Sequence, residues 1–168
     1  MRDDSRRWPP TFRAAPGIDL GAADLKRAQP KRQTLISGSH VLKQMDVPVI
    51  EWPAIAQSDS YALSLRRDRV LLVNGPERRE GWDETQKHAV SDASDAFAVF
   101  DLTGPGAMAL LQRGADVSQT VASPSVARMF FGLNVLLYRG APADHYRIHV
   151  PAAQQDALIN HLSSVARA

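Results

Sequence analysis

The 168-residue chain is 44% hydrophobic and 23% charged, which is the composition of an ordinary globular protein and excludes global disorder. It contains no cysteine, which excludes disulfides, thiolate metal sites, thiol nucleophiles and iron–sulfur ligation. The first ten residues carry charge without the apolar stretch of a secretory signal, and no apolar run approaches the roughly 20 residues of a membrane span. We therefore expect a soluble, cytoplasmic protein.

Positive charge and proline gather in the first 34 residues. This segment holds eight lysines and arginines against four aspartates, whereas the remainder of the chain is slightly acidic. Its prolines, at positions 9, 10, 16 and 30, fix the backbone φ angle and remove amide donors. The sequence therefore predicts an extended arm over 1–34 and a single α+β domain over 35–168.

The arm contains residue types that dominate protein interfaces. Aromatic and arginine side chains supply most of the binding energy at such surfaces, so five residues are candidate partner contacts: Arg6, Arg7, Trp8, Phe12 and Arg13. A frayed, solvated terminus is the alternative. Nucleic-acid binding is disfavoured, because four aspartates interrupt the basic residues.

After the arm, apolar residues alternate between strand and helix periods. Residues 60–74 predict a hairpin with a polar tip at Arg67 and Asp68, and 75–89 favours a helix only moderately because Gly81 interrupts it. Strands are predicted at 95–102, 126–132, 133–139 and 145–150, and an amphipathic helix follows within 152–168. The pattern indicates an α+β fold, an antiparallel or mixed sheet covered by two or three helices, close to ferredoxin-like arrangements.

Glycines and a proline punctuate the stretch "GPGAMALLQRG" at 104–114. It matches neither the P-loop nor the dinucleotide fingerprint, and Pro105 removes an amide that a phosphate cradle would use. We interpret it as a helix with Gly104 as N-cap, Pro105 in the first turn and Gly114 just past the end in a left-handed conformation. Ala107, Leu110 and Leu111 would then face the sheet.

The titratable residues form no recognisable catalytic set. His145 and His149 share a strand face, but Arg147 between them would repel a metal ion. Asp92 and Asp95 are more typical of a turn before a strand than of carboxylate catalysis. Trp52 is either a core or an interface aromatic, with the core favoured. We therefore predict no catalytic, cofactor-binding or metal-binding residues in this chain.

Three short motifs in series resemble a known family. They are Val-x-Asp-x-Ser-Asp, Leu-Thr-Gly-Pro at the end of a strand, and Leu-Leu-x-x-Gly at the end of a helix, met here by Val90, Asp92, Ser94 and Asp95, by Leu102, Thr103, Gly104 and Pro105, and by Leu110, Leu111 and Gly114. Together with the early hairpin, they resemble the gamma subunit of heterotetrameric sarcosine oxidase, which is similar in turn to the folate-binding domain of aminomethyltransferase. The sequence departs from that pattern after the helix, where "ADVSQTVASPS" is shorter and lacks the family's cysteine.

The resemblance implies a small, non-catalytic subunit. In that family FAD, FMN, NAD and tetrahydrofolate belong to partner subunits, and the partners would be larger alpha-type and beta-type flavoprotein subunits and a small delta-type subunit. The complex would oxidatively demethylate sarcosine or a related N-methyl amino acid and pass the one-carbon unit to tetrahydrofolate.

Two alternatives stay open. The chain could be an autonomous folate-binding, one-carbon-transfer protein, for which Asp101, inside a strand, is the candidate carboxylate for a pterin ring. It could also be an RNA-binding module that uses the basic arm, although it lacks the aromatic sheet motif of an RRM.

Overall fold

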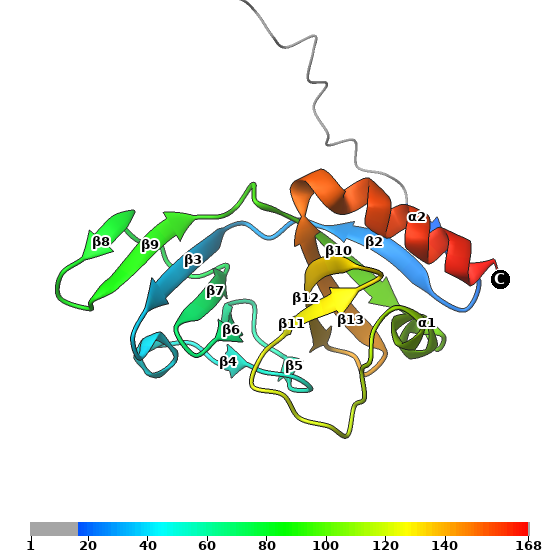
Figure 1. Ribbon diagram of the computed structural model, residues 1–168, viewed down its shortest axis with the longest axis horizontal. Coiled ribbons are helices and arrows are strands. Elements are labelled where there is room, and N and C mark those ends of the chain that lie inside the picture. Colours follow the sequence, from blue (N-terminus) through cyan, green and yellow to red (C-terminus); the bar gives the residue numbers. More distant parts are fainter. Residues whose placement is uncertain (1–16, 168) are drawn as a thin grey trace, which may run out of the picture.

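Two β-sheets and two α-helices make up the computed structural model, which describes residues 17–167 (Figure 1). The larger sheet has the strand order β1-β2-β10-β13-β12-β11, and β5 pairs with β12. The strands are β1 (Ile18–Asp19), β2 (Asp24–Ala28), β5 (Ile55–Ala56), β10 (Phe97–Thr103), β11 (Ala127–Phe130), β12 (Leu133–Gly140) and β13 (His145–Pro151). Neighbours are antiparallel except for β5 and β12, which run parallel.

The smaller sheet has the order β4-β6-β7-β3-β9-β8. Its strands are β3 (Gln33–Gly38), β4 (Val49–Ile50), β6 (Tyr61–Arg66), β7 (Arg69–Val73), β8 (Gly81–Asp83) and β9 (His88–Asp92). Only β4 and β6 are parallel. The 3₁₀-helix η1 (Val41–Gln44) and the chain that follows it to β4 cover the outer face of this sheet with partly buried apolar side chains.

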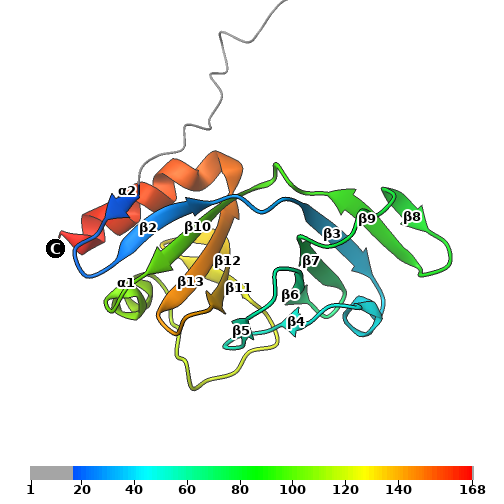
Figure 2. The same ribbon diagram turned by 180° about the vertical axis from the view of Figure 1, so that it is seen from behind.

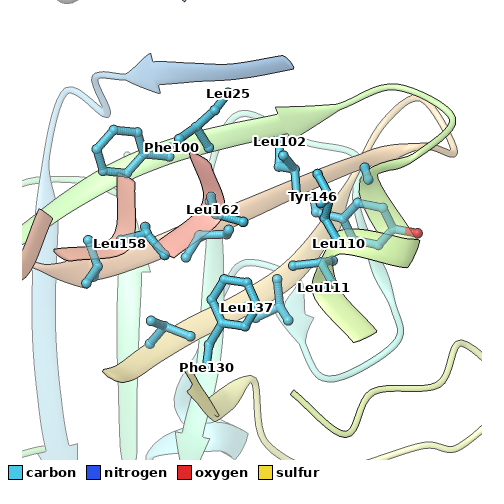
Figure 3. Packing of buried hydrophobic residues seen from close by; sticks show 14 of the residues in the cluster. Leu25, Phe100, Leu102, Leu110, Leu111, Phe130, Leu137, Tyr146, Leu158 and Leu162 are labelled. Carbon is cyan, nitrogen blue, oxygen red and sulfur yellow. The ribbon is translucent and has the colours of Figure 1, made fainter. Parts of the chain in front are cut away.

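Both α-helices lie on the larger sheet, as the two opposite views show (Figures 1 and 2). These are α1 (Ala107–Gly114) and α2 (Gln155–Ala166), the second preceded by the 3₁₀-helix η2 (Ala152–Gln154). Leu110 and Leu111 from α1 and Leu158 and Leu162 from α2 pack against apolar side chains of the strands (Figure 3). Within residues 17–167, no helix combines the length and apolar character needed to cross a membrane.

Period-2 alternation separates the two faces of the larger sheet. In β13, Tyr146, Ile148 and Val150 point toward the helices and are fully buried. His145, Arg147 and His149 take the intervening positions and therefore lie on the other face. The predicted division of this strand into an apolar and a polar face is confirmed.

The predicted hairpin, the four predicted strands and the C-terminal helix are all present, so the α+β class is confirmed. The prediction of one sheet is wrong, because the early hairpin belongs to the second, smaller sheet. The helix considered for 75–89 is also wrong. That segment forms β8 and a turn into β9, in which Gly81 has a φ of 105° and Asp83 accepts the amides of Thr85 and Gln86.

The arm predicted for 1–34 is wrong over residues 17–34. Strand β2 pairs with the central strand β10, and Leu20, Ala23 and Leu25 are buried in the helix-covered core. Pro30 lies between β2 and β3, where it interrupts neither strand. Three of the five residues of β2 are charged, and only Leu25 is fully buried, so the charges concealed a half-buried strand.

Helix α1 begins later than predicted. Gly104, with a φ of 113°, lies in the turn before the helix, Gly106 is the N-cap, and the first helical residue is Ala107. Gly114 is the last helical residue, without the left-handed conformation predicted for it. Its requirement for glycine is steric, because a Cβ there would lie 2.5 Å from Cε2 of Phe130.

Candidate functional site

A row of polar side chains crosses the larger sheet on the face turned away from the helices. Strand register places Lys26 (β2), Asp101 (β10), Arg147 (β13) and Tyr138 (β12) at directly opposed positions in four neighbouring strands. Residues opposed in this way share a face and lie within side-chain reach. Asp101, Arg147 and Tyr138, together with His145 in β13, belong to a cluster of hydrogen-bonded titratable groups that spans several strands.

Asp101 occupies the partly exposed end of this cluster. Its Oδ1 accepts from Nε of Arg147 at 2.7 Å and lies 2.8 Å from Nε2 of His145, and its Oδ2 accepts from a terminal nitrogen of Arg147 at 3.3 Å. The other ring nitrogen of His145 lies 3.0 Å from the carbonyl oxygen of Ala141. One carboxylate therefore holds two basic side chains in place.

The buried end of the cluster crosses to the smaller sheet. Arg147 donates to the hydroxyl of Tyr61 (β6) at 3.0 Å, and that hydroxyl lies 2.7 Å from the hydroxyl of Tyr138. Tyr138 lies 2.9 Å from Nε2 of His149, whose Nδ1 lies 2.8 Å from Oε1 of Gln33 (β3). The contacts therefore cross between the sheets three times: from Arg147 to Tyr61, back to Tyr138, and from His149 to Gln33.

Gln33, the last residue of this network, sets the donor and acceptor of each hydrogen bond in it. Nε2 of Gln33 donates to the carbonyl oxygen of Ser94 at 3.1 Å, so its Oε1 faces His149 and must accept. Nδ1 of His149 therefore carries the proton, Nε2 accepts from Tyr138, and Tyr138 accepts from Tyr61. Each donor in the chain has an acceptor, which is the condition under which a buried polar network stabilises a fold.

The pKa values at the exposed end favour the charged forms. Burial by itself would raise the pKa of Asp101, but the hydrogen bonds from His145 and Arg147 outweigh it and hold that pKa below its ordinary value. The hydrogen bond to Asp101 raises the pKa of His145. Burial by itself would lower the pKa of Arg147, but its hydrogen bonds to Asp101 and the charge of that carboxylate outweigh burial, so Arg147 keeps its charge.

At the buried end the pKa values favour the neutral forms. Burial, reinforced by the charge of Arg147, lowers the pKa of His149 to about 3. Burial and the neighbouring hydroxyl of Tyr61 raise the pKa of Tyr138 well above its ordinary value. A neutral imidazole and a protonated phenol are the states that the hydrogen-bond directions require, so geometry and electrostatics agree.

This arrangement holds the two sheets together more readily than it performs chemistry. A general base or nucleophile needs a free lone pair directed at a substrate. Here both oxygens of Asp101 are engaged, and His149 is fully buried. A pterin ring bound at Asp101 would have to share that carboxylate with Arg147 and His145.

The other residues considered from the sequence have local roles. Asp92 accepts from both the amide and the hydroxyl of Ser94, which is the predicted turn before a strand, and Asp95 is exposed. Trp52 is 2% exposed and donates from its indole to the carbonyl of Ser118, in agreement with the core interpretation. The predicted partner contacts Arg6, Arg7, Trp8, Phe12 and Arg13 lie outside the described residues.

His145 and His149 lie on one face, as predicted, but one binds Asp101 and the other lies between Tyr138 and Gln33. Within residues 17–167, no group of three or more potential ligands could hold a metal ion. Sequence reasoning missed Gln33, Tyr61 and Tyr138. The available signal was weak: a tyrosine within an apolar strand needs a hydrogen-bond partner when it is buried.

Comparison with known proteins finds similarity of structure but not of sequence. No family model matches the sequence, and no curated protein matches it. Among solved structures, the fold is similar to that of a chain of heterotetrameric sarcosine oxidase from Corynebacterium sp. U-96 in complex with pyrrole 2-carboxylate, with a TM-score of 0.65, 18% identity, and coverage of 99% of this chain and 95% of that chain. Glycine cleavage system aminomethyltransferase T from Bartonella henselae gives a TM-score of 0.48 and 14% identity over 82% of this chain and 44% of that one. This protein therefore shares the fold of one chain of a heterotetrameric sarcosine oxidase.

Proposed function

We propose that this protein is a non-catalytic, gamma-type subunit of a heterotetrameric sarcosine oxidase-like complex. The observation that carries the proposal is the end-to-end correspondence with a chain of such an oxidase, which leaves almost nothing of either chain uncovered. A chain of this length that serves as one part of an assembly needs no complete active site of its own. The assembly would demethylate sarcosine or a related N-methyl amino acid by oxidation and transfer the one-carbon unit to tetrahydrofolate.

In this proposal the cofactors FAD, FMN, NAD and tetrahydrofolate lie in partner chains. Those partners are larger alpha-type and beta-type flavoprotein subunits and a small delta-type subunit. The polar cluster supports this division, because Asp101 and Arg147 satisfy each other and His149 is sealed from solvent. The N-terminal residues Arg6, Arg7, Trp8, Phe12 and Arg13 remain proposed contacts with a large subunit.

Copurification from the native cells tests the proposal. The chain, tagged at its C-terminus, is expected to bring down large chains in fixed proportion, and the eluate is expected to show a flavin absorption spectrum. The same tag on an unrelated protein is the control. The chain expressed alone is expected to be colourless and without amine oxidase activity, so stoichiometric flavin on the isolated chain would contradict the proposal.

Folate binding distinguishes the alternative function. An autonomous folate-binding protein would bind tetrahydrofolate as an isolated chain, with a heat of binding that Asp101→Asn abolishes. We expect no such heat from the isolated chain, because Arg147 and His145 already occupy the carboxylate. Tight, saturable binding that depends on Asp101 would replace the subunit proposal with the folate-binding one.

A further inference from the structure

Two hollows adjoin at the end of the smaller sheet where the β6–β7 hairpin turns. One, of about 680 Å³, lies beside the β3–η1 connection and is lined by Ser39, His40 and Lys43 among others. The second, of about 520 Å³, lies beside Leu65, Pro124 and Ser125. Leu42, Arg67 and Asp68 line both, so the two hollows form one continuous surface with the hairpin tip between them. We call this the hairpin-tip surface.

The hairpin-tip surface is positively charged, and two of its cations form no ion pair within the described residues. Its carboxylate, Asp68, is held by Arg66 through two hydrogen bonds of 2.9 and 3.1 Å. Arg69, the first residue of β7, donates to the hydroxyl of Ser37. Within residues 17–167 the exposed side chains of Arg67 and Lys43 form no ion pair. Two cations therefore face solvent above the hollows.

Apolar side chains line part of each hollow, among polar and charged ones. Leu42 lines both, Leu65 lines the second and is only partly buried, and Pro124 is exposed beside it. Pro124 has no backbone N–H, so this wall offers no amide there to a phosphate. Two adjoining hollows that share an apolar side chain and carry the cations Arg67 and Lys43 suit a segment in which apolar and acidic side chains alternate, because such a segment can contact the apolar side chains and pair with both cations.

We propose that the hairpin-tip surface binds an extended acidic segment of a partner protein. Apolar side chains of that segment enter the two hollows, and its carboxylates pair with Arg67 and Lys43. Residues 1–16 of this chain are an unsuitable occupant, because they carry four arginines against two aspartates. The inference concerns any protein partner and does not depend on that partner being an oxidase.

Fluorescence anisotropy with short labelled peptides tests the inference on the full-length chain. A peptide in which Leu and Asp alternate is expected to bind, and its affinity should fall as salt screens the charges. A Leu–Asn peptide, which lacks the charge, and a Ser–Asp peptide, which lacks the apolar side chains, should each bind at least several-fold more weakly. Equal binding of all three peptides, or no binding of the first, would overturn the inference.

Charge-reversal variants locate the site. The double variant Lys43→Glu/Arg67→Glu should weaken binding of the Leu–Asp peptide by about tenfold or more, because attraction becomes repulsion at two positions. The double variant Arg79→Glu/Arg167→Glu changes the net charge equally at exposed positions outside the two hollows and should retain binding. Equal losses in the two double variants would contradict the assignment of the surface.

Two further measurements keep the result interpretable. Thermal melting of both double variants should match the unaltered chain, and the milder Lys43→Gln/Arg67→Gln variant, which removes the charges without reversing them, should give an intermediate affinity. A single-stranded oligonucleotide serves as a second probe. Tighter binding of the oligonucleotide than of the Leu–Asp peptide, lost in the Lys43→Glu/Arg67→Glu variant, would assign the surface to nucleic acid and overturn the inference.

Discussion

The two sheets of this protein bury their outer faces in different ways. Helices α1 and α2 cover the larger sheet and pack large side chains such as Phe100, Phe130 and Leu137 into one core (Figure 3). The smaller sheet has only η1 and the chain up to β4, which contribute Val41 fully and Leu42, Met45 and Val47 partly. A helix presents a continuous apolar stripe, whereas an irregular segment contributes separate side chains. The helix-covered half should therefore be the more rigid.

Between these halves lies a joint of mixed character. Apolar residues of both sheets, including Leu63, Leu71 and Leu136, form a core of their own, and the polar network from Asp101 to Gln33 runs beside it. Apolar contacts are non-directional, but hydrogen bonds fix which atoms meet. The network therefore adds specific atom-to-atom contacts to an apolar core that joins the two sheets.

Matched cavities in the two outer cores give the largest expected effect. Leu102 in the helix-covered core and Leu72 in the outer core of the smaller sheet are both fully buried. Leu102→Ala should lower the free energy of unfolding by about 3–5 kcal/mol, and Leu72→Ala by about 2–3 kcal/mol, because the segment over Leu72 can move into the space. Urea unfolding measures both, and an equal or reversed order would contradict the difference in rigidity.

Breaking the joint at Asp101 should cost nearly as much. Asp101→Asn leaves Arg147, which is 26% exposed, without its compensating charge, and should lower the free energy of unfolding by about 2–3 kcal/mol. Asp92→Asn is the matched control, since that carboxylate bonds Ser94 in an exposed turn and should cost clearly less. Similar losses for both variants, measured by urea unfolding, would show that Asp101 stabilises the fold no more than a carboxylate in an exposed turn does.

The close contact between α1 and β11 gives a smaller effect. Gly114→Ala should destabilise by about 1–2 kcal/mol, because its Cβ would meet the rings of Phe130 and Phe131 at 2.5 and 2.6 Å, and the gain in helix propensity offsets only part of this. Gly132→Ala, at a φ of 79° with open space around it, tests backbone strain alone. An unchanged melting temperature for Gly114→Ala would contradict the steric explanation.

The pH dependence of His145→Gln is expected to be the smallest effect. The folded-state pKa of His145 is raised by Asp101, so its contribution to stability is complete below the unfolded value of about 6.5 and is lost as the pH rises through the folded value. The difference in stability between the unaltered chain and His145→Gln should therefore shrink with rising pH. In the Asp101→Asn background this pH dependence should disappear, and its persistence would assign it to another group.

Sequence patterns predicted local structure well where one face of an element is apolar. The strand β13 follows from period 2 and the helix α2 from period 3.6. The errors arose where local signals were mixed. Strand β2 was hidden by its charged residues, and the segment around β8 has a polarity that suits an exposed edge strand as well as a weak helix.

The sequence by itself determined the α+β class, the two faces of β13, and the absence of thiol chemistry, because each depends on residues close together in the chain. Only the tertiary structure decided that there are two sheets and that Gln33, Tyr61, Tyr138 and His149 join them. Gln33 and His149 are separated by 116 positions, and no periodicity relates residues that far apart. Their meeting depends on the strand order and on the packing of one sheet against the other, which only the whole fold determines.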